Sequence, residues 1–380
     1  MFNNYLSRLA LPVILLFVSF SVTAQNSIKP KYSNSTIYTG IEVGSKGVKM
    51  SVVEIGKNAQ INGAFNILKD SSVNTDFISF TEPTFTATLN GFCSFYNTAL
   101  KEYKIPSKRI FTVISSGVKM QAEKDAKLAW INNLIDSFRL KIKEPQRNVE
   151  VVDVLQESKL SHLGIVPEAR RYSTFLIDIG SGNTKGGFFP YGNTNDFKLF
   201  QLNWGTKSTT NAVEKNCGED KSLVNFNRQL YKILAGAENS EITYTVNASG
   251  AYPVSDNIAV SGGIAWATAS LMHPELLDNS VIAITYGELV QFSQKLYYNF
   301  GALAPAFIAL DVKKDDRDNV IKELTRVQQV FDQRALMAGT GLLLKIMRQF
   351  ESVFASKQFF LVKNGQVGWV SAYVDEHVTD

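Results

Sequence analysis

Two short segments of the chain share one order of residue types, in which an acid at a strand end is followed by a Gly-Ser turn. Residues 41–49 align without gaps to residues 177–185, and both read apolar, acid, apolar, Gly, Ser, two variable residues, a β-branched residue and Lys. Glycine lets the backbone approach a ligand closely, and successive amides in such a turn form a nest for phosphate oxygens. The pattern therefore predicts two phosphate-binding turns.

The side chains around these turns add the chemistry that a phosphate ligand needs. Ser45, Ser181 and Thr184 carry hydroxyl groups that can donate hydrogen bonds to phosphate oxygens. Glu42 and Asp178 are hard oxygen ligands, suited to Mg²⁺ directly or through water. Two such turns facing each other across a cleft would hold a phosphate chain and its metal from both sides.

A chance match would explain either copy alone, because glycine turns are common. The two copies begin 136 residues apart, however, which is the length of a domain. An internal repeat at this spacing, with the same kind of strand series opening at each copy, favours duplication.

The strands and helices that must position the turns follow a regular order. The first half predicts strands at 37–43, 48–55 and 61–68, then helix 86–103, strand 110–114, helix 121–140, strand 149–155 and helix 157–163. The second half predicts strands at 174–179, 185–189 and 197–202, helices at 207–214 and 223–234, strand 258–260 and a helix from Ala265. Three hairpin strands followed by αβ units are typical of a ribonuclease-H-like domain, with a mixed sheet and helices on both faces.

The end of the chain completes this α/β prediction. Helices are expected at 317–330 and 333–350, and a closing hairpin of 359–362 with 367–374 around Asn364-Gly365. We expect an N-terminal domain at 36–168 and a C-terminal domain at 172–380, with an interdomain cleft between the two turns.

The N-terminus has the layout of a secretory signal peptide, with cleavage near Ala24. One positive charge in residues 1–8 precedes an apolar run at 9–22, which is too short to span a bilayer comfortably. We expect residues 1–24 to be removed and the protein to be periplasmic or secreted, without stable membrane insertion. Cys93 and Cys217 would then meet an oxidising compartment, where a disulfide and two free buried thiols are equally compatible with the sequence.

Composition limits the possible functions. The 380 residues are 45% hydrophobic and 19% charged, which is an ordinary globular composition. The net charge of +4 comes without a basic tract, so a nucleic-acid partner is not expected. Three His and two Cys exclude the common Cys/His zinc sites.

Five segments in order carry a resemblance to a known family. They are residues 38–45, 115–119, 157–164, 177–184 and 260–265. The paired turns look like the two phosphate motifs of the actin-like, sugar-kinase and heat-shock-chaperone superfamily. Within that superfamily, the chain most resembles the exopolyphosphatase and guanosine pentaphosphate phosphohydrolase (Ppx/GppA) family.

The resemblance implies two actin-like ATPase domains and assigns roles to individual residues. Glu157 matches the family's catalytic glutamate, which orients or deprotonates the attacking water. Glu42 and Asp178 would hold Mg²⁺, and the family suggests a homodimer. The expected phosphate-binding residues are Gly44, Ser45, Lys119, Gly180, Ser181, Gly182, Asn183, Thr184 and Lys207.

The sequence also departs from the family pattern. Glu42 stands where the family usually has Asp, and Lys119 replaces Arg, which exchanges a bidentate fork for a point charge. The second turn usually continues to a closing acid, whereas this chain has Lys185. Together these changes leave altered specificity or lost catalysis open.

The leading functional hypothesis is a Mg²⁺-dependent hydrolase that releases terminal phosphate from polyphosphate. An exported enzyme would not ordinarily meet the cytoplasmic alarmone guanosine pentaphosphate, so polyphosphate or another phosphoanhydride fits the location better. The alternatives are a catalytically inactive protein that binds phosphorylated ligands, and an actin-like or kinase-type ATPase.

Overall fold

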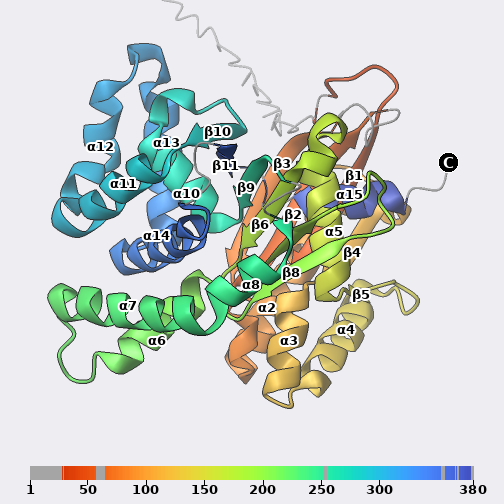
Figure 1. Cartoon of the computed structure of the whole chain (residues 1–380). Coiled ribbons are helices and arrows are strands. Elements are labelled where there is room, and N and C mark those ends of the chain that lie inside the picture. Colours follow the sequence, from red (N-terminus) through yellow and green to blue (C-terminus); the bar gives the residue numbers. More distant parts are fainter. Residues whose placement is uncertain are drawn as a thin grey trace, which may run out of the picture.

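The computed structural model describes residues 28, 30–56, 65–251, 255–351, 356–363, 365 and 368–377. The predicted signal peptide lies outside these residues. Two mixed β-sheets, each flanked by helices, make up the described chain (Figure 1).

The first sheet has the strand order β3-β2-β1-β4-β5. The first three strands form the predicted antiparallel hairpins, and β4 and β5 run parallel to β1. Their bounds are β1 (Thr36–Val43), β2 (Gly47–Ile55), β3 (Phe65–Asn74), β4 (Ile110–Ile114) and β5 (Glu150–Val151). The third strand thus runs beyond the predicted 61–68, of which residues 61–64 are not described.

The second sheet repeats this order and adds an edge strand, as β10-β11-β9-β6-β7-β8. β6, β7 and β8 form the hairpins, β9 and β11 run parallel to β6, and β10 is antiparallel. The bounds are β6 (Thr174–Ile179), β7 (Thr184–Phe188), β8 (Lys198–Leu202), β9 (Asn257–Ser261), β10 (Val281–Ile284) and β11 (Gln358–Val362). The predicted fold class, two ribonuclease-H-like units, is confirmed.

Strand register extends the repeat from sequence to space. Glu42 pairs with Lys49 across β1 and β2, and Asp178 pairs with Lys185 across β6 and β7. Directly opposite residues on neighbouring strands have their side chains on the same face of the sheet. Each acid therefore has a lysine beside it.

Helices cover both sheets and enclose two apolar cores. The first core packs α2 and α4 on β1 and β2, with Phe92 stacked on Phe138 at a 3.7 Å centroid distance. The second core packs the later helices on β6 and β9. The helix bounds are α2 (Glu82–Asn97), α3 (Ser116–Lys124), α4 (Leu128–Ile142), α5 (Val154–Ile165), α6 (Thr206–Asn216), α7 (Leu223–Ala237), α8 (Thr243–Ala248), α10 (Gly263–Met272), α11 (Tyr286–Tyr298), α12 (Pro305–Ile308), α13 (Arg317–Val330), α14 (Gln333–Arg348) and α15 (Gly368–Glu376).

Two predicted elements of the first half divide differently. The helix expected at 121–140 is two helices, because Ala126 adopts a left-handed conformation with φ 55° between α3 and α4. The strand expected at 149–155 is short, because the Asp153 carboxylate accepts the Gln156 amide at 2.8 Å and caps α5. The sequence pattern also did not predict α8, β10, α11 or α12.

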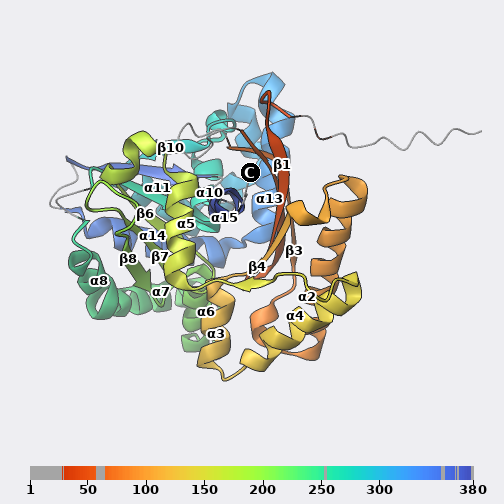
Figure 2. The same cartoon turned by 90° about the vertical axis from the view of Figure 1, so that its right-hand side faces the viewer.

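The predicted C-terminal hairpin is wrong. β11 is present, but the segment after it forms α15, whose Trp369, Ala372 and Tyr373 are buried at helical spacing. α15 packs against α5, and a Cβ atom on Gly164 would lie 2.0 Å from the Gly368 carbonyl oxygen. The helix thereby joins a cluster that includes Tyr38 of the first sheet, and Figure 2 shows α5 and α15 between the two sheets.

The remaining observations concern the membrane and the cysteines. Within the described ranges, no helix combines the length and the apolar character that a bilayer crossing requires. Cys93 and Cys217, both in described segments, are free thiols. Cys217 belongs to the second core, and Cys93 packs against the first.

Candidate phosphate site

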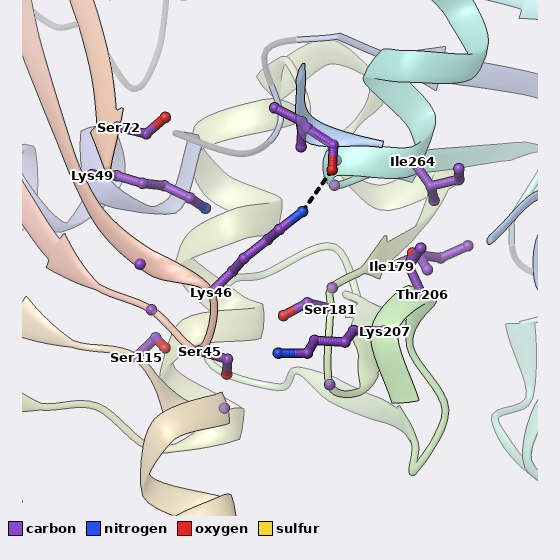
Figure 3. A pocket seen from close by; sticks show the side chains of 18 of the residues that line it. Ser45, Lys46, Lys49, Ser72, Ser115, Ile179, Ser181, Thr206, Lys207 and Ile264 are labelled. Atoms are coloured by element: carbon purple, nitrogen blue, oxygen red, sulfur yellow. Dashed lines mark hydrogen bonds between the residues drawn. The ribbon is translucent and has the colours of Figure 1, made fainter. Parts of the chain in front are cut away.

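Both Gly-Ser turns line one cavity of about 360 Å³ between the two sheets. In Figure 3, Ser45 and Ser115 lie on one side of this cavity, and Ser181, Thr206 and Lys207 lie on the other. Of the residues predicted from sequence, the cavity wall includes Glu42, Gly44, Ser45, Glu157, Asp178, Gly180, Ser181, Gly182, Asn183 and Lys207.

The first turn closes the β1–β2 hairpin. The Gly44 amide donates to the Gly47 carbonyl at 2.8 Å, and the Gly47 amide donates back to the Gly44 carbonyl at 3.2 Å. The amides of Ser45 and Lys46, between these bonds, have no hydrogen-bond partner among the described residues. They are free to donate to an anion in the cavity.

The second turn is held by the first turn of α6. The Gly180 carbonyl accepts from the Thr206 amide at 2.9 Å, and the Ser181 carbonyl accepts from the Lys207 amide at 2.8 Å. In a trans peptide the N–H group points opposite to the carbonyl of the same unit. The amides of Ser181 and Gly182 therefore point away from α6, and both residues line the cavity.

Glu157 lies in the first turn of α5 and is buried, with 2% of its surface exposed. Its Oε2 atom accepts the Ser116 amide at 2.8 Å, which ties α5 to the start of α3. Glu42 and Asp178, at the ends of β1 and β6, line the same cavity. Three carboxylates from both halves of the chain therefore converge.

Lys185 is a central residue of the site that the sequence pattern did not assign to it. Its Nζ atom lies 2.7 Å from Glu157 Oε1 and 3.8 Å from Asp178 Oδ2, and 7% of its side chain is exposed. Lys49, at the equivalent position of the first copy, lies 3.9 Å from Glu42 Oε2. The sequence feature that could have identified Lys185 is the lysine at the end of each repeated segment. The hairpin register places that lysine directly opposite the acid.

Burial and mutual charge shift the pKa values of this cluster. Burial would raise the pKa of Glu157, but the charge of Lys185 and hydrogen bonds from Lys185 and Ser116 hold it below its ordinary value. Burial raises the pKa of Glu42 and of Asp178 against the opposing charges of Lys49 and Lys185. Burial would lower the pKa of Lys185, but Glu157 and Asp178 raise it. Glu157 and Lys185 are therefore both charged at neutral pH.

The donor set does not fit the Mg²⁺ ion predicted between Glu42 and Asp178. An ammonium group already lies between Glu157 and Asp178, and a divalent cation beside it would be repelled. Among the described residues, no group of three or more His, Cys, Asp or Glu has a geometry that could hold a metal. Glu42 Oε2 is buried without a hydrogen bond there, which agrees with the raised pKa of this carboxyl.

Two predicted phosphate ligands lie off the cavity wall. Thr184 is fully buried, and its hydroxyl donates to the Trp204 carbonyl at 2.7 Å, so it is not available to a ligand. Lys119 lies two residues beyond Gly117, which faces the first turn. Two residues turn an α-helix by about 200°, so Lys119 lies on the opposite side of α3 from Gly117.

Other basic residues at the cavity are committed to contacts between the halves of the chain. Lys207 is ion-paired with Asp76, and Arg326 lies 3.1 Å from Asp70. The Lys46 ammonium donates to the Val330 carbonyl at 2.8 Å (Figure 3). Sequence reasoning missed Lys46 and Arg326 because these contacts join segments far apart in the chain.

Comparison with known proteins identifies the fold. No family model matches the chain, and no curated protein sequence matches it. The crystal structure of the Aquifex aeolicus member of the Ppx/GppA protein family superposes with a TM-score of 0.59 at 15% identity, covering 91% of this chain and 100% of that one. An exopolyphosphatase from Cytophaga hutchinsonii superposes with a TM-score of 0.53 at 13% identity, covering 90% and 98%. The chain therefore has the fold of Ppx/GppA structures, as its sequence motifs predicted.

Proposed function

We propose that the cavity binds a condensed phosphate chain and that the protein is a phosphoanhydride hydrolase of the exopolyphosphatase type. One observation carries this proposal: two turns, with amides that have no hydrogen-bond partner among the described residues, line one cavity whose wall includes the buried carboxylate of Glu157. The fold supports it, because one similar structure is described as an exopolyphosphatase and another as exopolyphosphatase-like.

The turns and the lysines stabilise the phosphoryl group during its transfer. Amides of Ser45, Lys46, Ser181 and Gly182 donate to the nonbridging oxygens, and the ammonium group of Lys185 opposes their charge. A water oxygen bonds to the terminal phosphorus while the bridging P–O bond breaks. The products are orthophosphate and a chain shorter by one unit, and the proton lost by the water passes to a phosphate oxygen or to solvent.

Glu157 orients the attacking water in this scheme. Its lowered pKa keeps it ionised, so it accepts a hydrogen bond from the water but is a weak base for complete proton removal. Ser116 and Lys185 fix both carboxylate oxygens, which sets the direction from which a water can approach.

Inorganic polyphosphate is the substrate that we propose. The predicted export of the protein separates it from cytoplasmic nucleotides, and a linear chain of phosphates matches a cavity with one nest at each side.

A second candidate function, ligand binding without turnover, is favoured by the same ion pair. Both oxygens of Glu157 already have protein partners, at 2.7 Å and 2.8 Å. A carboxylate held in this way would then position Ser116 and Lys185 for ligand binding without taking part in hydrolysis.

Orthophosphate release from long-chain polyphosphate by the purified chain lacking residues 1–24 separates these functions. We expect release by the wild type and a loss of about 100-fold or more in Glu157→Gln, the scale of a positioned acid–base group. Glu168→Gln, the same change at an exposed position, is the control and should keep full activity.

Three other outcomes would decide against hydrolysis at this site. Tight polyphosphate binding without release would support the binding protein. Turnover of ATP alone would support the ATPase hypothesis. Equal release by wild type and Glu157→Gln would remove Glu157 from the mechanism.

A further inference from the structure

Lys185 is a buried cation at the point where three carboxylates converge. Its side chain is 7% exposed, yet it lines the cavity together with Glu42, Glu157 and Asp178. A buried lysine is rare unless it is paired, and this one interacts with acids from both halves of the chain.

The strand that carries Lys185 is tightly held. Gly186 and Gly187 follow it in β7, and a Cβ atom on them would lie 2.0 Å from the carbonyl oxygens of Leu176 and Lys198, respectively. β7 is therefore pressed between β6 and β8, and the backbone from which Lys185 extends cannot shift without disturbing both neighbours. The ammonium position is built into the sheet.

We propose that the Lys185 ammonium is the resident cation of this site, in place of a divalent metal, and that the cavity binds its phosphate ligand as the metal-free anion. The statement about the cation rests on the geometry of Lys185 alone. The statement about the ligand rests on the proposed function.

The hydrogen-bonding capacity of Lys185 agrees with this role. An ammonium group has three N–H donors, and one of them meets Glu157 Oε1 at 2.7 Å. Asp178 at 3.8 Å is a charge neighbour beyond hydrogen-bond distance. Counting the described residues, two donors remain for phosphate oxygens.

Lys49 repeats the arrangement in the first half of the chain. It lies 3.9 Å from Glu42 Oε2, its side chain is 36% exposed, and it lines the cavity. Each sheet thus supplies a lysine to neutralise its own acid, by the same cross-strand register. Two fixed charges from two strands can supply what a single divalent ion would otherwise provide.

Binding of Mn²⁺, measured by electron paramagnetic resonance on the folded wild-type chain, tests the statement about the cation. We expect no site of submillimolar affinity in the wild type. Removing the ammonium in Lys185→Met should expose the carboxylates and tighten Mn²⁺ binding at least about tenfold, and adding Asp178→Asn should reverse the gain. Lys119→Met, the same change away from the cavity, should bind like the wild type.

Mn²⁺ binding by the wild type tests the proposal even if the Lys185→Met variant does not fold. Submillimolar Mn²⁺ binding by the wild type that is lost in Asp178→Asn would overturn the proposal. A folded Lys185→Met variant that gains no Mn²⁺ affinity would also count against it.

Calorimetric titration with tripolyphosphate tests the statement about the ligand. We expect wild-type affinity to be equal in Mg²⁺ and in EDTA, and Lys185→Met to bind at least about tenfold more weakly in EDTA, the loss of one charged hydrogen bond. Binding that requires Mg²⁺ would overturn this statement. A wild type that binds no tripolyphosphate in either condition would overturn the proposed function, and the Mn²⁺ result would still stand.

Discussion

At the scale of single residues, a missing side chain positions the second Gly-Ser turn. A Cβ atom on Gly205 would lie 2.7 Å from the Asn183 amide nitrogen and from the Gly180 and Ser181 carbonyl oxygens. Such distances require the backbone to move. The absence of a side chain at 205 therefore lets the start of α6 bind the carbonyls of the turn and leave its amides to the cavity.

Gly205→Ala should lower the free energy of unfolding by about 1–3 kcal/mol, because the added methyl group overlaps backbone atoms. Phosphate affinity should fall with it, since the turn must shift. Gly236→Ala is the matched control, because position 236 is an exposed site within α7 with nothing near its Cβ. That change should raise the free energy of unfolding by up to about 1 kcal/mol. Urea unfolding of both variants measures the difference, and equal effects would contradict the packing argument.

At the scale of elements, α5 connects the site to the body of the molecule. Its first turn supplies Glu157, and Gly164 near its end allows close contact with α15. Between them lies His162, which is fully buried and contacts the Thr174 carbonyl at 3.0 Å through Nε2. Burial lowers the pKa of His162 from 6.5 to about 4, so the folded helix holds a neutral imidazole.

This histidine should make stability depend on pH. Well above pH 6.5 the His162 side chain is neutral in both the folded and the unfolded chain, so its titration does not change the free energy of unfolding. As the pH falls from 6.5 to about 4, His162 binds a proton in the unfolded chain but not in the folded chain. The free energy of unfolding should therefore fall by about 3 kcal/mol.

His162→Gln keeps a hydrogen-bond donor but cannot titrate, so it isolates this effect. We expect a smaller decline of the unfolding free energy between pH 6.5 and 4 than in the wild type. Chemical unfolding at several pH values measures the slope, and identical slopes would show that His162 is not the group responsible.

At the scale of the whole molecule, β3 is tied to the second half of the chain across the cavity. Asp70 pairs with Arg326 of α13 at 3.1 Å, and Asp76, just after β3, pairs with Lys207 of α6. These contacts are partly exposed, and such pairs contribute little to the free energy of unfolding. Their effect should instead be on how often the two halves separate.

Removing both acids in Asp70→Asn with Asp76→Asn should open the cavity more often. We expect a larger radius of gyration in small-angle X-ray scattering, with an unfolding free energy changed by no more than about 1 kcal/mol per pair. Asp136→Asn is the control, because Asp136 is 76% exposed and its one ion pair among the described residues is within its own helix, with Arg139 at 3.5 Å. Unchanged scattering in the double variant would show that other contacts hold the halves together.

The sequence determined the fold and ten of the residues that line the cavity, because both depend on local patterns. Residues 41–49 and 177–185 repeat a strand-turn-strand signal that needs no distant partner to be recognised. The alternation of strands and helices around each copy then led to two sheets of the same strand order. Glycine and serine at the turns indicate a particular backbone conformation, and that conformation also depends on neighbouring residues alone.

Only the tertiary structure decided the charge balance of the site and the secondary structure of residues 368–376. Lys185 meets Glu157 because a hairpin register and the docking of α5 bring together residues 28 positions apart. Lys119 and Thr184 have side chains that could bind phosphate, but neither reaches the cavity. Lys119 lies on the far side of α3, and the Thr184 hydroxyl donates to the Trp204 carbonyl. Residues 368–376 became a helix because α5 offers a glycine contact and an apolar surface for it. Ion pairing and packing depend on which surfaces meet in space, and that information is not contained in any short segment.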